Sequence, residues 1–492
     1  MVFSSNIFLL YFMPAFFLVY FLTPRKARNY VLLLASLIFY AWGAPEFIFQ
    51  LVGSTVANFF LVKWMCKTEK KGLKKLLCGL SIIIPIGLLM FYKYGNFTME
   101  NLNAILGLTG HAPLTWKRIM LPIGISFFSF QSVTYTLDTY RGVNQPMEKL
   151  TDFVLYITMF PQLIAGPIIR YCDVADQIRS RESTMDDRLQ GFFRFVIGLC
   201  KKILIADVIG AQVDAILGPA NYSLLDASQV SDIFTRVAAL DSTSAWIVSL
   251  AYTFQIYFDF AGYSDMAIGL GRIMGFRFPE NFDNPYTSRS ITEFWRRWHI
   301  TLGTFMRNYL YIPLGGNRRG TVRTYLNLWV VFLLSGLWHG ASWNYVLWGA
   351  YHGCFLVLER FLSRHVRAFD TKRRHPLFVL PTFIILVVGW SLFRIENLPT
   401  CWQFVRRLFS FDFAGFSLSQ QPQFYVMLVV ALCFSFLTLL PFGRRLEQAV
   451  FYTDYRRPLV HLLVWLAACL LFFFCLSALT ATDFSPFIYF RF

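Results

Sequence analysis

Charged residues are scarce along this chain. Only 15% of the 492 residues are Asp, Glu, Lys or Arg, whereas 56% are hydrophobic. That balance exceeds what the core of a water-soluble protein can bury, and it excludes the soluble globular class. We therefore expect a polytopic integral membrane protein.

Period-two alternation is also missing from the apolar runs, which excludes a membrane β-barrel. About 20 helical residues span the roughly 30 Å hydrocarbon core, and backbone polar groups in lipid must be satisfied within the segment. The predicted fold is all-α, with about 11–12 transmembrane helices plus re-entrant or interfacial helices. The expected spans are 7–22, 30–42, 47–64, 76–92, 119–139, 192–216, 245–270, 325–337, 346–362, 377–393, 424–440 and 459–479.

Pro161 and Pro167 interrupt the apolar stretch 153–169, which favours a re-entrant or interfacial helix there. Long linkers and fixed-period repeats are absent, so the simplest partition is one integral domain over residues 1–492, with a motif core at about 119–363. The N-terminus lacks the basic region of a cleavable signal, and we expect the first span to be retained.

The net charge of +17 does not indicate nucleic-acid binding, because basic residues gather in alternate loops. Residues 95–116 contain no Lys or Arg, and 218–243 contain only Arg236. By the positive-inside rule the Lys- and Arg-rich loops are cytoplasmic and both termini are outside. The loops predicted to be cytoplasmic are 25–28, 63–75, 170–202, 272–323, 360–374 and 444–457.

The nine cysteines form no CxxC pair and no zinc-type spacing, and they are interpreted as small apolar side chains. No His or carboxylate stands four residues from His299 or His339, which argues against a metal there. A GxSxG elbow is absent, which excludes that class of serine hydrolase. We expect no tightly bound cofactor.

What the chain does contain is a dense run of Arg, Trp, Gly, Asn and His between Phe258 and His352. Ionisable side chains in the apolar layer cost about 2.5–3.5 kcal/mol each on insertion scales, so a chain that keeps several usually needs them. His339 ends an apolar run, and Gly336 and Gly340 are expected to leave room for a substrate beside it. An imidazole there is suited to be a general base; the alternative is a histidine satisfied by a neighbouring helix.

The segment around His299 predicts an amphipathic helix on the cytoplasmic side, capped by Ser290 or Thr292. Arg296 and Arg297 in this helix could bind the phosphate of an anionic thioester donor, because guanidinium groups bind phosphate bidentately. They could equally bind lipid headgroups, and the residues alone leave both readings open.

Several ordered motifs stand in this region, and one precedes it. The motifs are Phe258–Asp265 (FDFAGYSD), Asn281–Tyr286 (NFDNPY), Glu293–His299 (EFWRRWH), Tyr311–Gly316 (YIPLGG), Gly336–Gly340 (GLWHG) and the earlier Met159–Ile168 (MFPQLIAGPI). Together they resemble the membrane-bound O-acyltransferase family. The resemblance is closest to the bacterial branch that includes the membrane subunit of alginate O-acetylation, and more distant to the teichoic acid D-alanyltransferases.

The resemblance implies a ring of membrane helices around a central funnel, with His339 as the essential base and His299 as the second polar position. It implies that an acyl thioester, acetyl-CoA or an acyl carrier, enters from the cytoplasm of a bacterial cell. The acetyl group would reach hydroxyls of an extracytoplasmic polysaccharide such as alginate, cellulose or another exopolysaccharide, through secreted acetyltransferase partners. Predicted substrate-binding residues are Arg296, Arg297, Trp298, Asn308, Tyr309 and Trp338, with Tyr263 as a further polar liner.

Two alternatives remain at this point. One is transfer of D-alanyl or another acyl group to a cell-wall polymer. The other is a transporter or scaffold without enzymatic activity. A transporter should show paired broken helices in two related halves, and the sequence has one polar cluster with no second copy.

Overall fold

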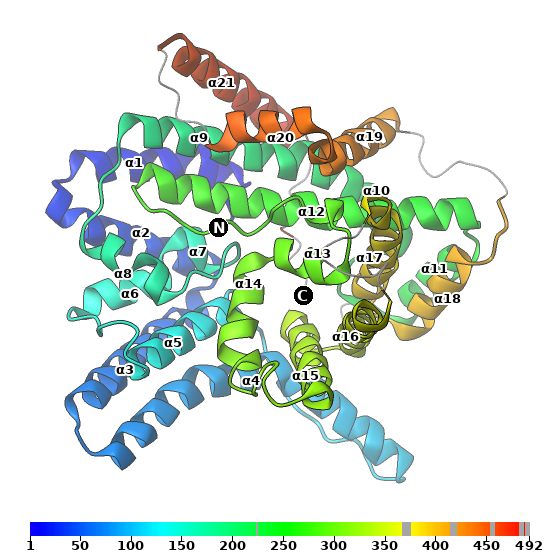
Figure 1. Cartoon of the computed structure of the whole chain (residues 1–492), viewed down its shortest axis with the longest axis horizontal. Helices are drawn as coiled ribbons and strands as arrows, with labels where there is room; N and C mark the ends of the chain where they lie inside the picture. Colours follow the sequence, from blue (N-terminus) through cyan, green and yellow to red (C-terminus); the bar gives the residue numbers. More distant parts are fainter. Residues whose placement is uncertain (223–224, 367–374, 414–420, 453–457, 482–486, 488–492) are drawn as a thin grey trace. The chain divides into compact units, whose positions relative to one another are not determined.

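The computed structural model describes residues 1–222, 225–366, 375–413, 421–452, 458–481 and 487 (Figure 1). Arg456, Arg457 and residues 367–374 of the predicted cytoplasmic loops lie outside this part. Helices make up the regular structure of the described residues, apart from one antiparallel bridge between Phe282 and Trp298. The all-α fold class is confirmed.

The chain divides into two compact units, Met1–Gly191 with Ala267–Pro279, and Phe192–Met266 with Glu280–Phe492. The single domain expected from the sequence stays a prediction. The first unit contains η1 (Phe8–Phe12), α1 (Met13–Leu22), η2 (Arg25–Ala27), α2 (Arg28–Gly43), η3 (Pro45–Phe47), α3 (Ile48–Lys67), α4 (Lys71–Leu108), α5 (Ile125–Tyr140), α6 (Leu150–Thr158), α7 (Phe160–Leu163) and α8 (Tyr171–Arg179).

Two helices contribute residues to both units, α9 (Met185–Cys200) and α12 (Ser242–Ile273). The other helices belong to the second unit. They are η4 (Lys201–Ala206), α10 (Asp207–Leu217), α11 (Ala227–Ala238), η6 (Pro285–Thr287), α13 (Ile291–Arg297), α14 (Ile300–Phe305), η7 (Met306–Tyr311), α15 (Thr321–His339), α16 (Trp343–His365), η9 (Pro376–Phe378), α17 (Val379–Arg394), α18 (Leu398–Leu408), α19 (Pro422–Phe436), η10 (Leu437–Leu439), α20 (Pro441–Glu447), η11 (Gln448–Tyr452) and α21 (Pro458–Ala481).

Five helical stretches in the described residues are long and apolar enough to cross a membrane: 45–67, 71–108, 376–394, 422–439 and 458–481. They match five of the predicted spans and establish a multi-pass membrane protein. The remaining predicted spans fall in helical segments that are shorter or less apolar than a conventional span. α12, for example, contains Asp259, Asp265 and Arg272.

The structure differs from the predicted spans at one place and confirms a predicted interruption at another. Residues 111–124 are not helical, so the span expected from residue 119 begins only at Ile125. The apolar stretch 153–169 is interrupted, as its prolines predicted: α6 ends at Thr158, α7 begins at Phe160, and Pro161 occupies the first turn of α7. Proline fits that position because the first helical N–H groups need no helical partner.

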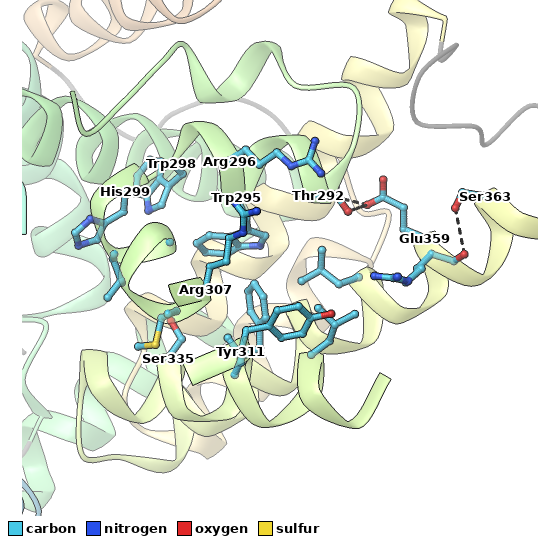
Figure 2. A pocket seen from close by; sticks show the side chains of 18 of the residues that line it. Thr292, Trp295, Arg296, Trp298, His299, Arg307, Tyr311, Ser335, Glu359 and Ser363 are labelled. Carbon is cyan, nitrogen blue, oxygen red and sulfur yellow. Dashed lines mark hydrogen bonds between the residues drawn. The ribbon is translucent and has the colours of Figure 1, made fainter. Parts of the chain in front are cut away.

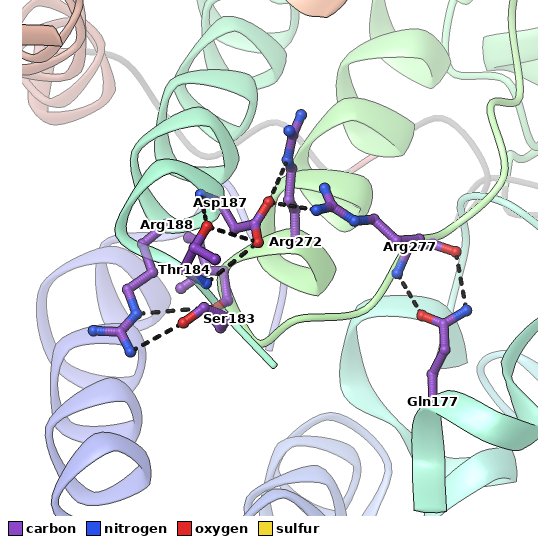
Figure 3. Close-up of polar contacts among 8 residues, drawn as sticks. Gln177, Ser183, Thr184, Asp187, Arg188, Arg272 and Arg277 are labelled. Carbon is purple, nitrogen blue, oxygen red and sulfur yellow. Dashed lines mark hydrogen bonds and ion pairs between the residues drawn. The ribbon is translucent and has the colours of Figure 1, made fainter. Parts of the chain in front are cut away.

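In the first unit, Asp187 joins the start of α9 to the end of α12 (Figure 3). One carboxylate oxygen accepts hydrogen bonds from Thr184, and the other pairs with Arg277 at 2.5 Å and Arg272 at 3.5 Å. Burial raises the pKa of this carboxyl, but the Thr184 hydrogen bonds and the Arg277 charge outweigh it, so the pKa lies below its usual value. The junction therefore stays ionised at physiological pH.

In the second unit, α12 is held by buried ion pairs. Lys202 of η4 lies between Asp207 and Asp259, at 2.6 and 2.8 Å. One helical turn or more further along α12, Asp265 pairs with Lys201 and Arg194, both at 2.6 Å. An unpaired charge in these positions would cost several kcal/mol, so the pairing fixes how η4 and α9 meet α12.

Helices α15 and α16 pack with their backbones in close contact. A Cβ atom at Gly336 would lie 2.2 Å from the carbonyl oxygen of Tyr345, and one at Gly349 would lie 2.4 Å from that of Phe332. Small residues thus let the two backbones touch. At the far end of the hairpin, Arg364 donates to the hydroxyl of Thr321 at 3.1 Å, so the helices run antiparallel.

Replacing Gly336 by Ala should separate this pair, because the added methyl overlaps the backbone of Tyr345. We expect a loss of about 1–3 kcal/mol and a lower unfolding temperature in detergent. The matched control is Gly353→Ala, since a Cβ there meets its neighbours at 3.7 Å, an ordinary contact. Equal unfolding temperatures for the two variants would show that the glycine contact is not limiting.

Candidate functional site

A cavity of about 510 Å³ lies within the second unit, between α13, α14, η7, α15 and α16 (Figure 2). Both histidines singled out from the sequence line it. So do Arg296 and Trp298. The remaining lining residues are Thr292, Trp295, Leu302, Gly303, Met306, Arg307, Tyr311, Leu328, Val331, Phe332, Ser335, Leu356, Glu359, Arg360, Ser363 and Arg364.

His339 is the last residue of α15, two residues beyond the end of the predicted span 325–337, and only 7% of it is exposed. Aromatic rings surround its imidazole: Trp338 at 4.9 Å, Trp348 at 5.2 Å and Phe393 at 5.3 Å between ring centroids. Such walls exclude bulk water while the cavity gives the ring access to a ligand.

The two glycines beside His339 do not leave the room that the sequence suggested. The space next to Gly336 is taken by the backbone of Tyr345, and the space next to Gly340 by the ring of the same tyrosine. Their small size serves the packing of α16 against α15. Access to His339 comes instead from the cavity on the side of Ser335, which lies one turn earlier on the same face of α15.

His299 stands between α13 and α14 with a left-handed backbone, φ 45° and ψ 54°, which is uncommon for a residue other than glycine. Its Nδ1 lies 3.0 Å from Oδ1 of Asn281, which also accepts from the hydroxyl of Thr301 at 2.9 Å. The Asn281 amide donates to Ser264 of α12 at 3.1 Å. Because Oδ1 is an acceptor, Nδ1 carries the proton and Nε2 carries the lone pair.

Burial lowers the pKa of His299 to about 3, so the ring is neutral across the physiological range. The bridge between Phe282 and Trp298 and the bond from the Ile300 N–H to the Asn281 carbonyl at 2.9 Å place these two segments in register. Phe260 of α12 packs edge-on against the imidazole at 4.8 Å. His299 is therefore a fixed, neutral hydrogen-bond acceptor.

The opposite end of the cavity is basic. Arg360 and Arg364 lie there, in the last turns of α16, where Arg364 bonds Thr321 at the start of α15. Arg307 of η7 and Arg296 of α13 line the cavity as well. None of the four guanidiniums forms an ion pair within the described part of the chain. The lining residues of α15 extend from Leu328 to His339, a distance of about 16 Å along the helix axis. The basic end and His339 are therefore about three helical turns apart.

Glu359 is the acidic residue of the lining, and it is 7% exposed. Its carboxylate accepts from the backbone N–H of Thr292 at 3.0 Å and from the hydroxyl at 3.3 Å. Ser290 accepts from the Glu293 N–H at 2.9 Å and caps the same helix, which confirms one of the two predicted caps. The start of α13 is thus fixed against α16, and Arg296 with it.

Four predicted site residues lie outside this lining. Arg297 pairs with Glu293 one turn earlier at 2.6 Å and with Thr287 at 3.0 Å. Asn308 and Tyr309 lie on η7, where Arg307 and Tyr311 face the cavity instead. Trp338 packs between the two imidazoles, 5.9 Å from that of His299.

Tyr263 also lies outside the lining, stacked on Phe487 at 4.5 Å. Within the described residues, no cluster of three His, Cys, Asp or Glu side chains could hold a metal ion.

The profile of the MBOAT, membrane-bound O-acyltransferase family, matches residues 81–402, about two thirds of the chain. The chain belongs to the membrane-bound O-acyltransferase family. It is an integral membrane acyltransferase.

Relatives of the chain carry related names. The "Probable alginate O-acetylase AlgI" of Pseudomonas putida is 40% identical over 512 residues, covering 100% of both chains. The "Peptidoglycan O-acetyltransferase" of Helicobacter pylori is 35% identical over 439 residues, covering 81% of this chain and 78% of the relative. The "Teichoic acid D-alanyltransferase" of Bacillus subtilis is 26% identical over 287 residues, covering 55% and 68%.

Reasoning from the sequence missed several lining residues of this acyltransferase. Arg307, Arg360 and Arg364 were attributed to membrane topology, because they fall in basic loops or at helix ends. A usable signal was the spacing of Arg360 and Arg364, which puts both on one face of α16. Asn281 stands in a recognised motif, but its contact with His299 depends on a tertiary pairing that spacing does not show.

Replacing Asn281 by Leu should remove the acceptor that orients His299. We expect acyl transfer to fall about tenfold or more, equivalent to about 1.4 kcal/mol, at every pH. Asn281→Asp keeps an acceptor but adds a negative charge, which raises the pKa of His299. That variant should lose activity selectively as the pH falls, because the ring then takes up a proton.

The measurement is the pH profile of acyl transfer by protein of verified monodispersity. A purely structural role for Asn281 would give both variants profiles of wild-type shape.

Proposed function

We propose that this protein transfers an acetyl group from a cytoplasmic thioester to hydroxyl groups of an extracytoplasmic polysaccharide. The observation that carries the proposal is one cavity with a basic end and a histidine end. The relatives named as acetylases or acetyltransferases, at 40% and 35% identity, favour acetyl over D-alanyl transfer. The D-alanyltransferase relative matches at lower identity and over less of the chain.

The basic end fits the phosphate groups of the donor. Guanidinium groups bind phosphate bidentately; Arg360 and Arg364 lie at the end of the cavity remote from His339, and Arg296 and Arg307 line the cavity as well. A donor with its phosphates there and an extended thioester arm along α15 would bring its carbonyl to His339. Acetyl-CoA and an acetylated carrier protein share this chemistry. The charged donor would then stay on the cytoplasmic side, and only the acetyl group would cross.

His339 acts as the general base in this proposal. It accepts the proton of an acceptor hydroxyl, the hydroxyl oxygen attacks the thioester carbonyl, and the carbon–sulfur bond breaks. The thiolate that leaves takes up the proton from His339, so the imidazole returns to its neutral form. His299, neutral and with its Nε2 lone pair, accepts a hydrogen bond from the acceptor or the donor arm. The aromatic walls limit hydrolysis by excluding water.

The setting we propose is the cytoplasmic membrane of a bacterium, with secreted or periplasmic acetyltransferases as partners that pass the acetyl group to the polymer. The five apolar helices and the basic loops support the multi-pass arrangement. Alginate, cellulose or another exopolysaccharide would serve as the acceptor class.

His339→Ala should lower acetylation of the extracellular polysaccharide by at least about 100-fold, the usual contribution of a general base. The measurement is acetate released from purified polymer, with membrane abundance of the protein determined in parallel. His365→Ala is the matched control, because His365 is exposed at the end of α16 and bonds its own helix at Phe361. Normal acetylation by His339→Ala would refute the assigned base.

Neutralising two guanidiniums of the basic end should weaken donor binding more than it slows the acyl-transfer step. For Arg360→Gln with Arg364→Gln we expect the KM for acetyl-CoA to rise at least about tenfold, because a charge-assisted hydrogen bond contributes about 1.5–3 kcal/mol. The kcat should change little. Release of CoA thiol by the protein in nanodiscs gives both constants.

Arg406→Gln provides the control, since Arg406 is an exposed arginine on α18 outside the cavity. An unchanged KM in the double variant would contradict the proposed donor site.

A further inference from the structure

The second half of α4 and the segment after it form an arm, residues 95–121, that the proposed acetyl transfer does not use. α4 has 38 residues and is about 57 Å long, nearly twice the thickness of a hydrocarbon core. Figure 1 shows the light-blue second half of α4 running in a different direction from the darker first half. The arm therefore begins where a membrane-crossing helix has completed its crossing.

The arm exposes apolar side chains along one edge. Leu108 is 89% exposed and Ile105 58%, one helical turn apart, and Leu102 lies a further turn back on the same face. The returning segment adds Met120 at 66% and Leu114 at 47%. Single exposed apolar residues need no explanation, but a contiguous edge of this kind marks an interaction surface.

Two asparagines of the arm face its returning segment. The Asn103 side chain forms two hydrogen bonds with the backbone of Leu114. Its amide N–H donates to the Leu114 carbonyl at 2.9 Å, and its oxygen accepts from the Leu114 N–H at 2.8 Å. Asn96 does the same for Ile119, at 2.8 and 3.0 Å, and also accepts from the indole N–H of Trp116 at 3.2 Å.

Other polar side chains of the arm bond to carbonyl groups of their own helix. Thr98 and Asn101 bond the carbonyls of Tyr94 and Phe97, one turn earlier. Pairing of the Leu114 and Ile119 backbone groups lowers the cost of placing the non-helical segment against lipid.

The charge of the arm agrees with a lipid surface. Glu100 is the single Asp, Glu, Lys or Arg between 95 and 116, and Lys117 and Arg118 follow directly. Basic residues at the edge of an apolar surface, together with an indole, are typical of segments that lie in the interface and face anionic headgroups.

We propose that the α4 arm lies in the membrane–water interface, with the edge formed by Leu102, Ile105 and Leu108 in contact with lipid acyl chains. The face of Asn96, Glu100 and Asn103 is turned away from the lipid. The arm continues the lipid contact already made by the membrane-crossing part of α4. This placement is independent of the acetyl transfer proposed above.

The test uses the full-length protein in nanodiscs of phosphatidylethanolamine and phosphatidylglycerol, with p-benzoylphenylalanine at position 105 or 108. After irradiation, intact-mass spectrometry counts phospholipid adducts. The matched control carries the same side chain at Glu100, on the other face of the same helix. We expect at least several-fold more lipid adducts at 105 and 108 than at 100.

Equal adduct yields at the three positions would overturn the placement. So would cross-links from 105 and 108 to another polypeptide in native membranes in place of lipid, which would make the edge a protein-docking surface. All three positions are exposed on α4, and a monodisperse elution profile identifies the variants that are folded. Polymer acetylation need not be measured, so failure of the arm proposal leaves the proposed function untouched.

Discussion

The contact between α15 and α16 determines where both ends of the cavity lie. Gly336 and Gly349 let the two backbones meet. Because the helices run antiparallel, the end of α15 and the end of α16 lie at opposite ends of the pair. His339 lies at the closed end of the hairpin, whereas Arg360 and Arg364 lie at the open end. Two glycines with no chemistry of their own thus set the distance between the phosphate-binding and proton-accepting groups of the proposed reaction.

A second constraint is the cost of removing polar groups from water. α12 carries two carboxylates within an apolar sequence, and both are paired with cations from α9 and η4. The same helix supplies Ser264, which accepts from Asn281, which in turn orients His299. The ion pairs and the imidazole therefore depend on one helix, although the ion pairs touch no part of the cavity. Residues distant from the lining can in this way decide its geometry.

The sequence predicted the fold class, a helix ending within two residues of His339, the Ser290 cap and the presence of both histidines at one site. These follow from patterns that are local or that several ordered motifs share. Local patterns could not show which of two adjacent arginines lines the cavity. Arg296 and Arg297 point about 100° apart on α13, and only the position of α16 decides that the first faces the cavity. Arg297 instead forms an ion pair with Glu293 on its own helix.

The α16 arginines were missed for a related reason. A basic residue at a helix end satisfies the positive-inside rule whether or not it lines a cavity, so composition alone cannot distinguish the two. The error at Gly336 and Gly340 has another cause. A missing side chain shows that something approaches closely, but it does not say whether a substrate or a neighbouring helix does so.

The backbone at position 299 restricts which residues natural variation can introduce there. A left-handed conformation is tolerated by Gly, Asn and Asp but is unfavourable for β-branched and bulky side chains. Asn combines that tolerance with a side chain that still offers an acceptor. Divergent members that dispense with the imidazole at this position should therefore have drifted toward Asn rather than toward Gln or Val, because the chain geometry filters the substitutions before chemistry does.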